Sequence, residues 1–341
     1  MSATSPRSTK VEIVAELAQG FEGRPEQARL LLRAAAAAGA DAAKFQLVYA
    51  DELAAPDYEH YELFQSLEMA DDVWADLANY ATKLGIELHL DIFGTRSLQV
   101  AERIGATAIK LHPTDIANVG LLSDVAHSSL REVQLGAGGA HAGEIKRALD
   151  LLTGKQVGLL FGFQGYPTPL ETNQIARVRY FADRIRETYP NVTVGFADHA
   201  PPESPLRFAL AVAAVGAGAR ILEKHLTLGR IMKLEDHESA LNPDEFAEFS
   251  EIVRQSAEAL GEPSDAEDFG MSAAEQSYRG AIRRHVVAGR DLTRNSTLGP
   301  ADLVLKRTSA DDVITDLTLA YDRRLKRDVR ENAPIRYTDI E

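Results

Sequence analysis

Hydrophobic residues along the chain follow two alternating patterns. Short runs rich in β-branched and other apolar residues recur, and longer amphipathic runs with a helical period lie between them. The eight short runs cover residues 11–17, 41–49, 86–92, 107–113, 132–137, 157–163, 192–198 and 219–226. Helical runs cover 25–39, 69–85, 142–154, 204–218 and 242–261, and several end on a glycine, as left-handed helix caps require.

Eight strand–helix units in this order predict a parallel (β/α)8 TIM barrel of the α/β class, over residues 1–262. A doubly wound open sheet is the structural alternative. No G-x-G-x-x-G fingerprint follows the first run, and polar residues recur at the carboxyl ends of many runs. Active sites of barrels lie at those ends, so the barrel is favoured.

The pattern changes after Gly261. Residues 261–280 are acidic and rich in small side chains, and the chain beyond them has short β-like runs broken by glycine, asparagine and proline. We therefore expect a linker at 263–280 and a small, mostly β domain at 281–341.

Composition narrows the class of protein. The 341 residues include 37 Lys and Arg against 51 Asp and Glu, a formal charge of −14, which disfavours binding to nucleic acid. The absence of cysteine excludes disulfides, thiolate metal sites and a cysteine nucleophile. No stretch approaches the roughly 18 apolar residues of a membrane span, and the N-terminus lacks an apolar segment, so we expect a cytoplasmic protein without a membrane partner.

Charged side chains recur near the strand ends. Residues two apart on a strand face the same way, which places four pairs on common faces: Lys44 with Gln46, His89 with Asp91, Lys110 with His112, and Glu223 with His225. One such residue alone is more simply explained by a local partner or by solvent. Their recurrence on many strands favours a functional site.

Two histidines form the most specific local signal. Asp198-His199 ends the seventh run and His225 ends the eighth, so adjacent strand ends place both imidazoles within reach of one metal ion. The eighth strand of a closed barrel neighbours the first, which brings Glu16 near. For each histidine alone, a hydrogen-bonded structural role is the alternative.

Lys44 and Lys110 face the interior from the second and fourth runs. They could supply fixed positive charge to a carboxylate or phosphate, or one could be a Schiff-base amine. A salt bridge to an interior carboxylate is an equally good interpretation.

The chain resembles the sialic acid synthase family over nearly its whole length. The matching segments are VAEL at Glu16, AGADAAKFQ at Lys44, AIKL at Lys110, YPTPLE from Tyr166, GFADHA at His199, ILEKHLTL at His225, EDHESALNPDEF from Glu235 and AIRRHVVAGRDL from Ala281. The resemblance implies a barrel followed by an antifreeze-like (SAF) domain. It also implies condensation of phosphoenolpyruvate with an amino-sugar aldehyde.

The resemblance also implies roles for individual residues. His199 and His225 would hold a divalent metal, Mn²⁺ first and Mg²⁺ or Co²⁺ as alternatives. Glu16 and Asp115 would lie near the reacting carbons, Asp115 standing where the family has glutamate. Lys44 would hold the enolpyruvyl donor together with Lys110.

Further positions would bind substrate. Tyr166 and Asp236 would contact the acceptor sugar, and Gln46, Gln164 and Asp198 complete the candidate set. The family forms homodimers in which the antifreeze-like domain of one chain covers the barrel mouth of the other, so Arg284 would reach the partner's acceptor.

Departures from the family are concentrated. Gly20-Phe21 replaces the family's Asn-His after the first run. Five donor-binding positions, where the family has Thr, Ser, Ser, Asn and Ser, here read Asp91, Pro113, Gly136, Gln164 and Ala197. Lost hydroxyl donors and an added carboxylate weaken phosphate binding, for which Lys44, Lys110, His112, Arg96 and the backbone of 136–139 could compensate.

Three functions remain open. The first is a phosphoenolpyruvate-dependent synthase of a 3-deoxy-2-ulosonic acid. The second is a metal-dependent aldol-type enzyme with a non-phosphorylated donor such as pyruvate. The third is a non-catalytic carbohydrate-binding relative, which the retained histidines, Glu16 and lysines disfavour.

Overall fold

The computed structural model describes residues 10–162, 165–261 and 264–341. The chain divides into two compact units, Met1–Glu262 and Pro263–Glu341. No helix of the described residues is long and apolar enough to cross a bilayer.

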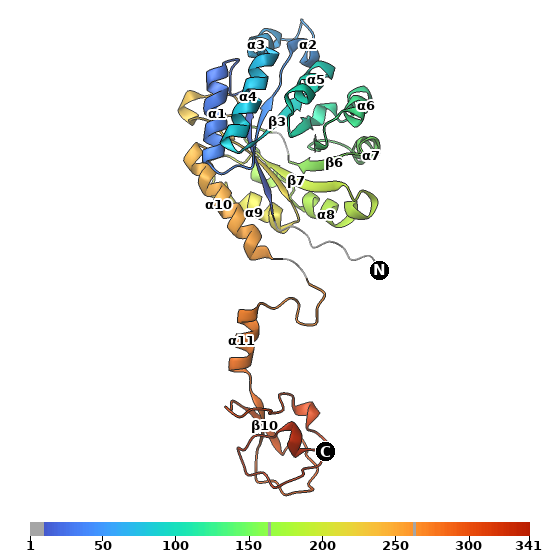
Figure 1. The fold of residues 1–341 in the computed structure, drawn as a ribbon, viewed down its shortest axis with the longest axis vertical. Coiled ribbons are helices and arrows are strands. Elements are labelled where there is room, and N and C mark those ends of the chain that lie inside the picture. Colours follow the sequence, from blue (N-terminus) through green and yellow to red (C-terminus); the bar gives the residue numbers. More distant parts are fainter. Residues whose placement is uncertain (1–9, 163–164, 262–263) are drawn as a thin grey trace. The chain divides into compact units, whose positions relative to one another are not determined.

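The first unit is a closed barrel of eight parallel strands in sequential order, which confirms the predicted fold (Figure 1). The strands are β1 (Glu12–Ala18), β2 (Ala42–Gln46), β3 (Glu87–Ile92), β4 (Ala108–Leu111), β5 (Glu132–Gly136), β6 (Gln156–Phe161), β7 (Val192–Asp198) and β8 (Ile221–His225). β1 pairs with both β2 and β8 and closes the barrel.

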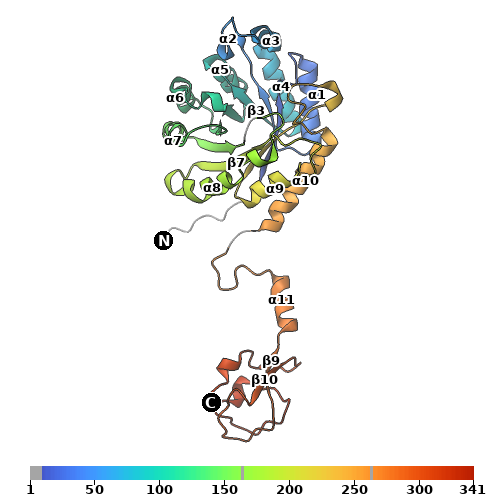
Figure 2. The same cartoon turned by 180° about the vertical axis from the view of Figure 1, so that it is seen from behind.

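Helices surround the strands on the outside of the barrel (Figure 2). They are α1 (Pro25–Ala37), α2 (Ala50–Leu53), α3 (Tyr61–Leu67), α4 (Asp71–Leu84), α5 (Thr95–Ile104), α6 (Val119–His127), α7 (Ala142–Leu151), α8 (Ala176–Thr188), α9 (Ala209–Gly216) and α10 (Pro243–Leu260). Short 3₁₀ turns η1 (Pro113–Asp115), η2 (Leu170–Thr172) and η3 (Arg230–Met232) lie in the loops. α10 packs against α9 and α1 and completes the ring.

The main core lies between strands and helices. Ile13 and Leu17 of β1 belong to it, because alternate residues of a strand face opposite sides. Phe21 is fully buried there and meets Phe45 and Trp74 edge-on, with ring centroids 5.7 and 5.6 Å apart. The departure at Gly20-Phe21 therefore supplies a core residue.

The second unit has its own core, which includes Val286, Leu298 and Ile335. β9 (His285–Ala288) pairs antiparallel with β10 (Leu303–Lys306), and isolated bridges and the turns η4 (Leu317–Leu319) and η5 (Tyr337–Asp339) complete it. The expected linker contains a helix, α11 (Ala273–Ile282), whose N-cap Ser272 accepts a hydrogen bond from Glu275 N at 3.1 Å. That capping pattern forms a helix although the surrounding composition is linker-like.

Candidate active site

The interior of the barrel contains a buried charge cluster, defined here as Glu16, Lys44, Asp91, Lys110 and Glu223. These side chains come from β1, β2, β3, β4 and β8. Each is at most 3% exposed. They point inward because they alternate with residues that face the helices.

Lys44 lies at the centre of this cluster. Its Nζ is 2.7 Å from Asp91 Oδ1 and 3.2 Å from Glu223 Oε2, and it also forms an ion pair with Glu16. Lys110 Nζ is 2.6 Å from Glu223 Oε1. Of the alternatives for these lysines, the structure shows interior salt bridges.

The cluster contains three carboxylates and two ammonium groups. Burial raises the pKa of Glu16 to about 7, partly opposed by Lys44, with Asp91 and Glu223 adding to the rise. Burial also raises the pKa of Glu223, but Lys110 and Lys44 hold it below its ordinary value. Glu16 thus takes up a proton more readily than Glu223 near neutral pH.

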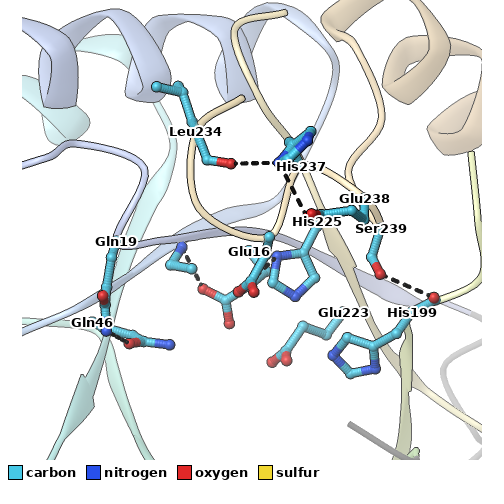
Figure 3. A network of polar contacts seen from close by, with 12 residues as sticks. Glu16, Gln19, Gln46, His199, Glu223, His225, Leu234, His237, Glu238 and Ser239 are labelled. Carbon is cyan, nitrogen blue, oxygen red and sulfur yellow. Dashed lines mark hydrogen bonds and ion pairs between the residues drawn. The ribbon is translucent and has the colours of Figure 1, made fainter. Parts of the chain in front are cut away.

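His199 and His225 lie beside the cluster, at the ends of β7 and β8, as the sequence predicts (Figure 3). Their ring centroids are 5.2 Å apart, and the Tyr166 ring meets both edge-on at 5.1 and 5.7 Å. Ser239 Oγ donates a hydrogen bond to His199 O at 3.1 Å. The Cα of Glu16 is paired in register with that of His225.

The two imidazoles suit a metal ion chemically. Burial lowers the pKa of His199 to about 3, and burial with the neighbouring His199 holds the pKa of His225 well below its ordinary value, so both rings are neutral. His199 Nδ1 is buried without a hydrogen-bond partner among the described residues. Neutral imidazoles are ligands of first-row divalent metals.

Within the described ranges, no group of three or more His, Cys, Asp or Glu side chains has metal-binding geometry.

Asp198 directly precedes His199 in the chain, and Asp236 lies near His225. Asp198 Oδ1 accepts hydrogen bonds from Ala200 N at 2.8 Å and Lys224 Nζ at 3.2 Å, so it holds the loop after β7. Asp236 Oδ2 lies 3.8 Å from His225 Nδ1. Burial, then Glu235, raises the pKa of Asp236 to about 7.

The structure does not bring every predicted residue into contact with the cluster. Gln46 Oε1 accepts a hydrogen bond from Gln19 Nε2 at 2.7 Å, at the end of β2. Asp115 lies in η1, and its hydrogen bonds are local, with Thr114 and Asn118. Arg284 is an exposed residue of the second unit, and Gln164 lies outside the described residues.

The sequence pattern placed Glu223 on one strand face with His225 but assigned it no role in the site. Glu223 bridges Lys44 and Lys110, and its carboxylate lies close to the imidazole of His199 in Figure 3. The available signal was its position two residues before His225 on the same strand face.

A cavity of about 540 Å³ lies at the opposite end of the barrel. Its lining includes Glu12, Gln134 and Arg220, near the starts of their strands. Catalytic groups of barrels come from the carboxyl ends of strands, so we place the candidate site at the histidine pair.

Comparison with known proteins identifies the family. Residues 31–265 match the NeuB family, and residues 283–341 match the SAF domain. The chain belongs to the NeuB family. Membership confirms the resemblance to sialic acid synthases and the predicted barrel followed by an SAF domain.

Relatives of this NeuB family member span its length. An uncharacterized protein of Methanocaldococcus jannaschii is 28% identical over 331 residues, covering 96% of this chain and 94% of that protein. The N,N'-diacetyllegionaminic acid synthase of Legionella pneumophila is 25% identical over 368 residues, covering 100% and 98%. The solved N-acetylneuraminic acid (sialic acid) synthetase of Leptospira borgpetersenii has a TM-score of 0.72 at 25% identity, covering 83% and 96%.

Proposed function

We propose that this protein is an enzyme that joins a three-carbon donor to the aldehyde carbon of a sugar and yields a sialic-acid-like 2-keto sugar acid. The observation that carries the proposal is the pair of buried, neutral imidazoles beside the charge cluster. The names of the relatives, a legionaminic acid synthase and a sialic acid synthetase, support it.

His199 and His225 would hold a divalent metal ion, which when bound supplies Lewis acidity for a carbonyl oxygen. Mn²⁺ is the first expectation, with Mg²⁺ and Co²⁺ as alternatives. A binding module without catalysis has no need of this arrangement next to buried lysines, which disfavours the non-catalytic alternative.

The remaining groups act as proton carriers and orienting contacts. Glu16, with a pKa of about 7, can take or return a proton near the reacting carbons. Burial, then Asp236, raises the pKa of Tyr166, so its phenol stays protonated and can donate a hydrogen bond to the acceptor. Asp236 can accept one.

Two donors are candidates. The resemblance favours phosphoenolpyruvate, whose C3 would attack the aldehyde before water adds at C2 and phosphate leaves. The ion pair between Lys44 and Asp91 favours the second, a non-phosphorylated donor such as pyruvate.

The SAF unit would contribute through a homodimer. We propose that Arg284 of one chain reaches the acceptor bound in the barrel of its partner. Arg284 is exposed in its own unit, which leaves its guanidinium accessible for such a contact.

The test is a pair of variants, His199→Ala and His225→Ala. We expect each to lose Mn²⁺ binding by calorimetry and to lose product formation, while the far-UV circular dichroism spectrum stays unchanged. His127→Ala, an exposed histidine on α6, is the matched control and should retain both. Full activity in either test variant would reject the metal assignment.

A further inference from the structure

The choice between the two candidate donors can be argued from the structure, and this argument rests on the proposed function. A phosphate dianion needs cations or N–H groups that are not already satisfied by carboxylates. The question is therefore whether the carboxyl end of the barrel offers such groups.

Lys44 does not offer a free charge. Its side chain is fully buried, and its three ion-pair partners are Glu16, Asp91 and Glu223. Lys110 is paired with Glu223 at 2.6 Å. Because both ammonium groups of the cluster are already paired with carboxylates, an added phosphate would compete with those carboxylates for the same cations.

Two other cations near the strand ends, Arg96 and Lys224, also have partners. The Arg96 guanidinium stacks on the Tyr49 ring at 3.6 Å and lies 3.9 Å from Asp71. Lys224 Nζ donates to Asp198 Oδ1 at 3.2 Å and to Ala200 O at 3.0 Å. The sequence left open that Arg96 compensates for lost phosphate-binding groups. Its observed contacts are instead with Tyr49 and Asp71.

His112 adds no positive charge at this end of the barrel. Burial lowers the pKa of His112, so its ring is neutral at pH 7. Its Nδ1 lies 3.0 Å from Thr114 Oγ1. A neutral imidazole gives no cation for a phosphate.

The space near Gly136 is filled as well. A Cβ at Gly136 would lie 2.4 Å from Pro113 Cδ and 3.0 Å from Pro113 N, so a serine there would clash. Proline has no N–H to donate. Pro113 and Gly136 are thus matched to each other, and together they remove both a hydroxyl and an amide donor from this position.

Ala197 is a third position that offers no donor to a phosphate. It packs inside the barrel with Val14, Leu160 and Ile221. An apolar contact of this kind gives no hydrogen bond to a phosphate oxygen.

We infer that the donor is a non-phosphorylated 2-oxo acid of three carbons, pyruvate, and that Asp91 is the fixed counter-charge of Lys44. The reaction is then an addition that balances by itself. C3 of pyruvate loses a proton to Glu16, the C3–aldehyde carbon bond forms, and the aldehyde oxygen gains a proton. Water is not consumed and phosphate is not released.

The first experiment needs no acceptor. The full chain loaded with Mn²⁺ is incubated with pyruvate in D₂O, and the methyl signal is followed by NMR. We expect enzyme-dependent loss of that signal, and with a panel of aldoses and N-acetyl amino sugars a product of summed mass without phosphate release. Phosphate release from phosphoenolpyruvate and an aldose would overturn the inference but support the proposed synthase. Inertness toward both donors would overturn the inference and the proposed function together.

The second experiment tests Asp91 by binding alone. Phosphoenolpyruvate binding to the metal-free protein in EDTA is measured by calorimetry for wild type, Asp91→Asn and the control Asp76→Asn, an exposed carboxylate on α4. We expect at least tenfold tighter binding for Asp91→Asn only. Equal affinity in all three proteins, or wild-type binding as tight as that of Asp91→Asn, would overturn the role of Asp91. Circular dichroism checks that the variants fold.

Discussion

Breaking one ion pair inside the barrel gives the sharpest test of the charge cluster. Lys110 Nζ and Glu223 Oε1 are 2.6 Å apart, and both side chains are at most 3% exposed. With an effective dielectric constant of about 20, two unit charges at this distance attract by about 6 kcal/mol. The cost of removing both charges from water offsets part of that attraction.

Glu223→Gln leaves Lys110 buried without its carboxylate. We expect this variant to lose about 3–5 kcal/mol of unfolding free energy, and Lys110→Met to lose a similar amount. The double variant Lys110→Met/Glu223→Gln should cost much less than the sum of the two single variants, because it leaves no unpaired ammonium at position 110.

Urea unfolding followed by tryptophan fluorescence measures these free energies. The chain has one tryptophan, Trp74, which is 1% exposed in the barrel, so the signal reports on the first unit. The exposed pair Lys146–Asp150 on α7 has the same 2.6 Å separation, and the same cycle there should give a far smaller coupling. If the losses of unfolding free energy at Lys110 and Glu223 simply add in the double variant, the two buried charges are not energetically coupled and the reasoning is refuted.

Two further predictions concern the second unit. Arg327 binds Asp339 through two hydrogen bonds, at 2.5 and 2.9 Å; burial raises the pKa of Asp339, but these bonds and the Arg336 amide hold it below its ordinary value. The bonds therefore stabilise the unit above pH 4, and this stabilisation is lost as pH falls through the lowered pKa of Asp339. Asp339→Asn should lower the unfolding free energy, measured by calorimetry, by about 2 kcal/mol at pH 7 and by almost nothing at pH 2. An equal loss at both pH values would contradict this. Arg284→Ala should raise KM for the acceptor several-fold with an unchanged melting temperature, and an unchanged KM would remove Arg284 from the acceptor site.

Local patterns in the sequence were enough for the eight strands, the barrel and the helices α1, α4, α7, α9 and α10, but α2, α3, α5, α6 and α8 were not predicted. Alternation of apolar residues and glycine stops predicted the strands and helices, because both depend on neighbours within a few residues. Since consecutive strands lie side by side in the barrel, the order alone also predicted that His199 and His225 end adjacent strands. Composition did not predict α11, which begins inside the expected linker and ends at Ile282.

The partners of the buried lysines were decided only by the tertiary structure. Lys44 contacts Asp91 across 47 positions, and Lys110 contacts Glu223 across 113. Strand alternation tells which side chains point inward, but the stagger of the closed barrel determines which of them meet. The same holds for Phe21, which in the sequence only follows the first strand. Its burial in the core depends on how strands and helices assemble, because its contacts are with Phe45 and Trp74.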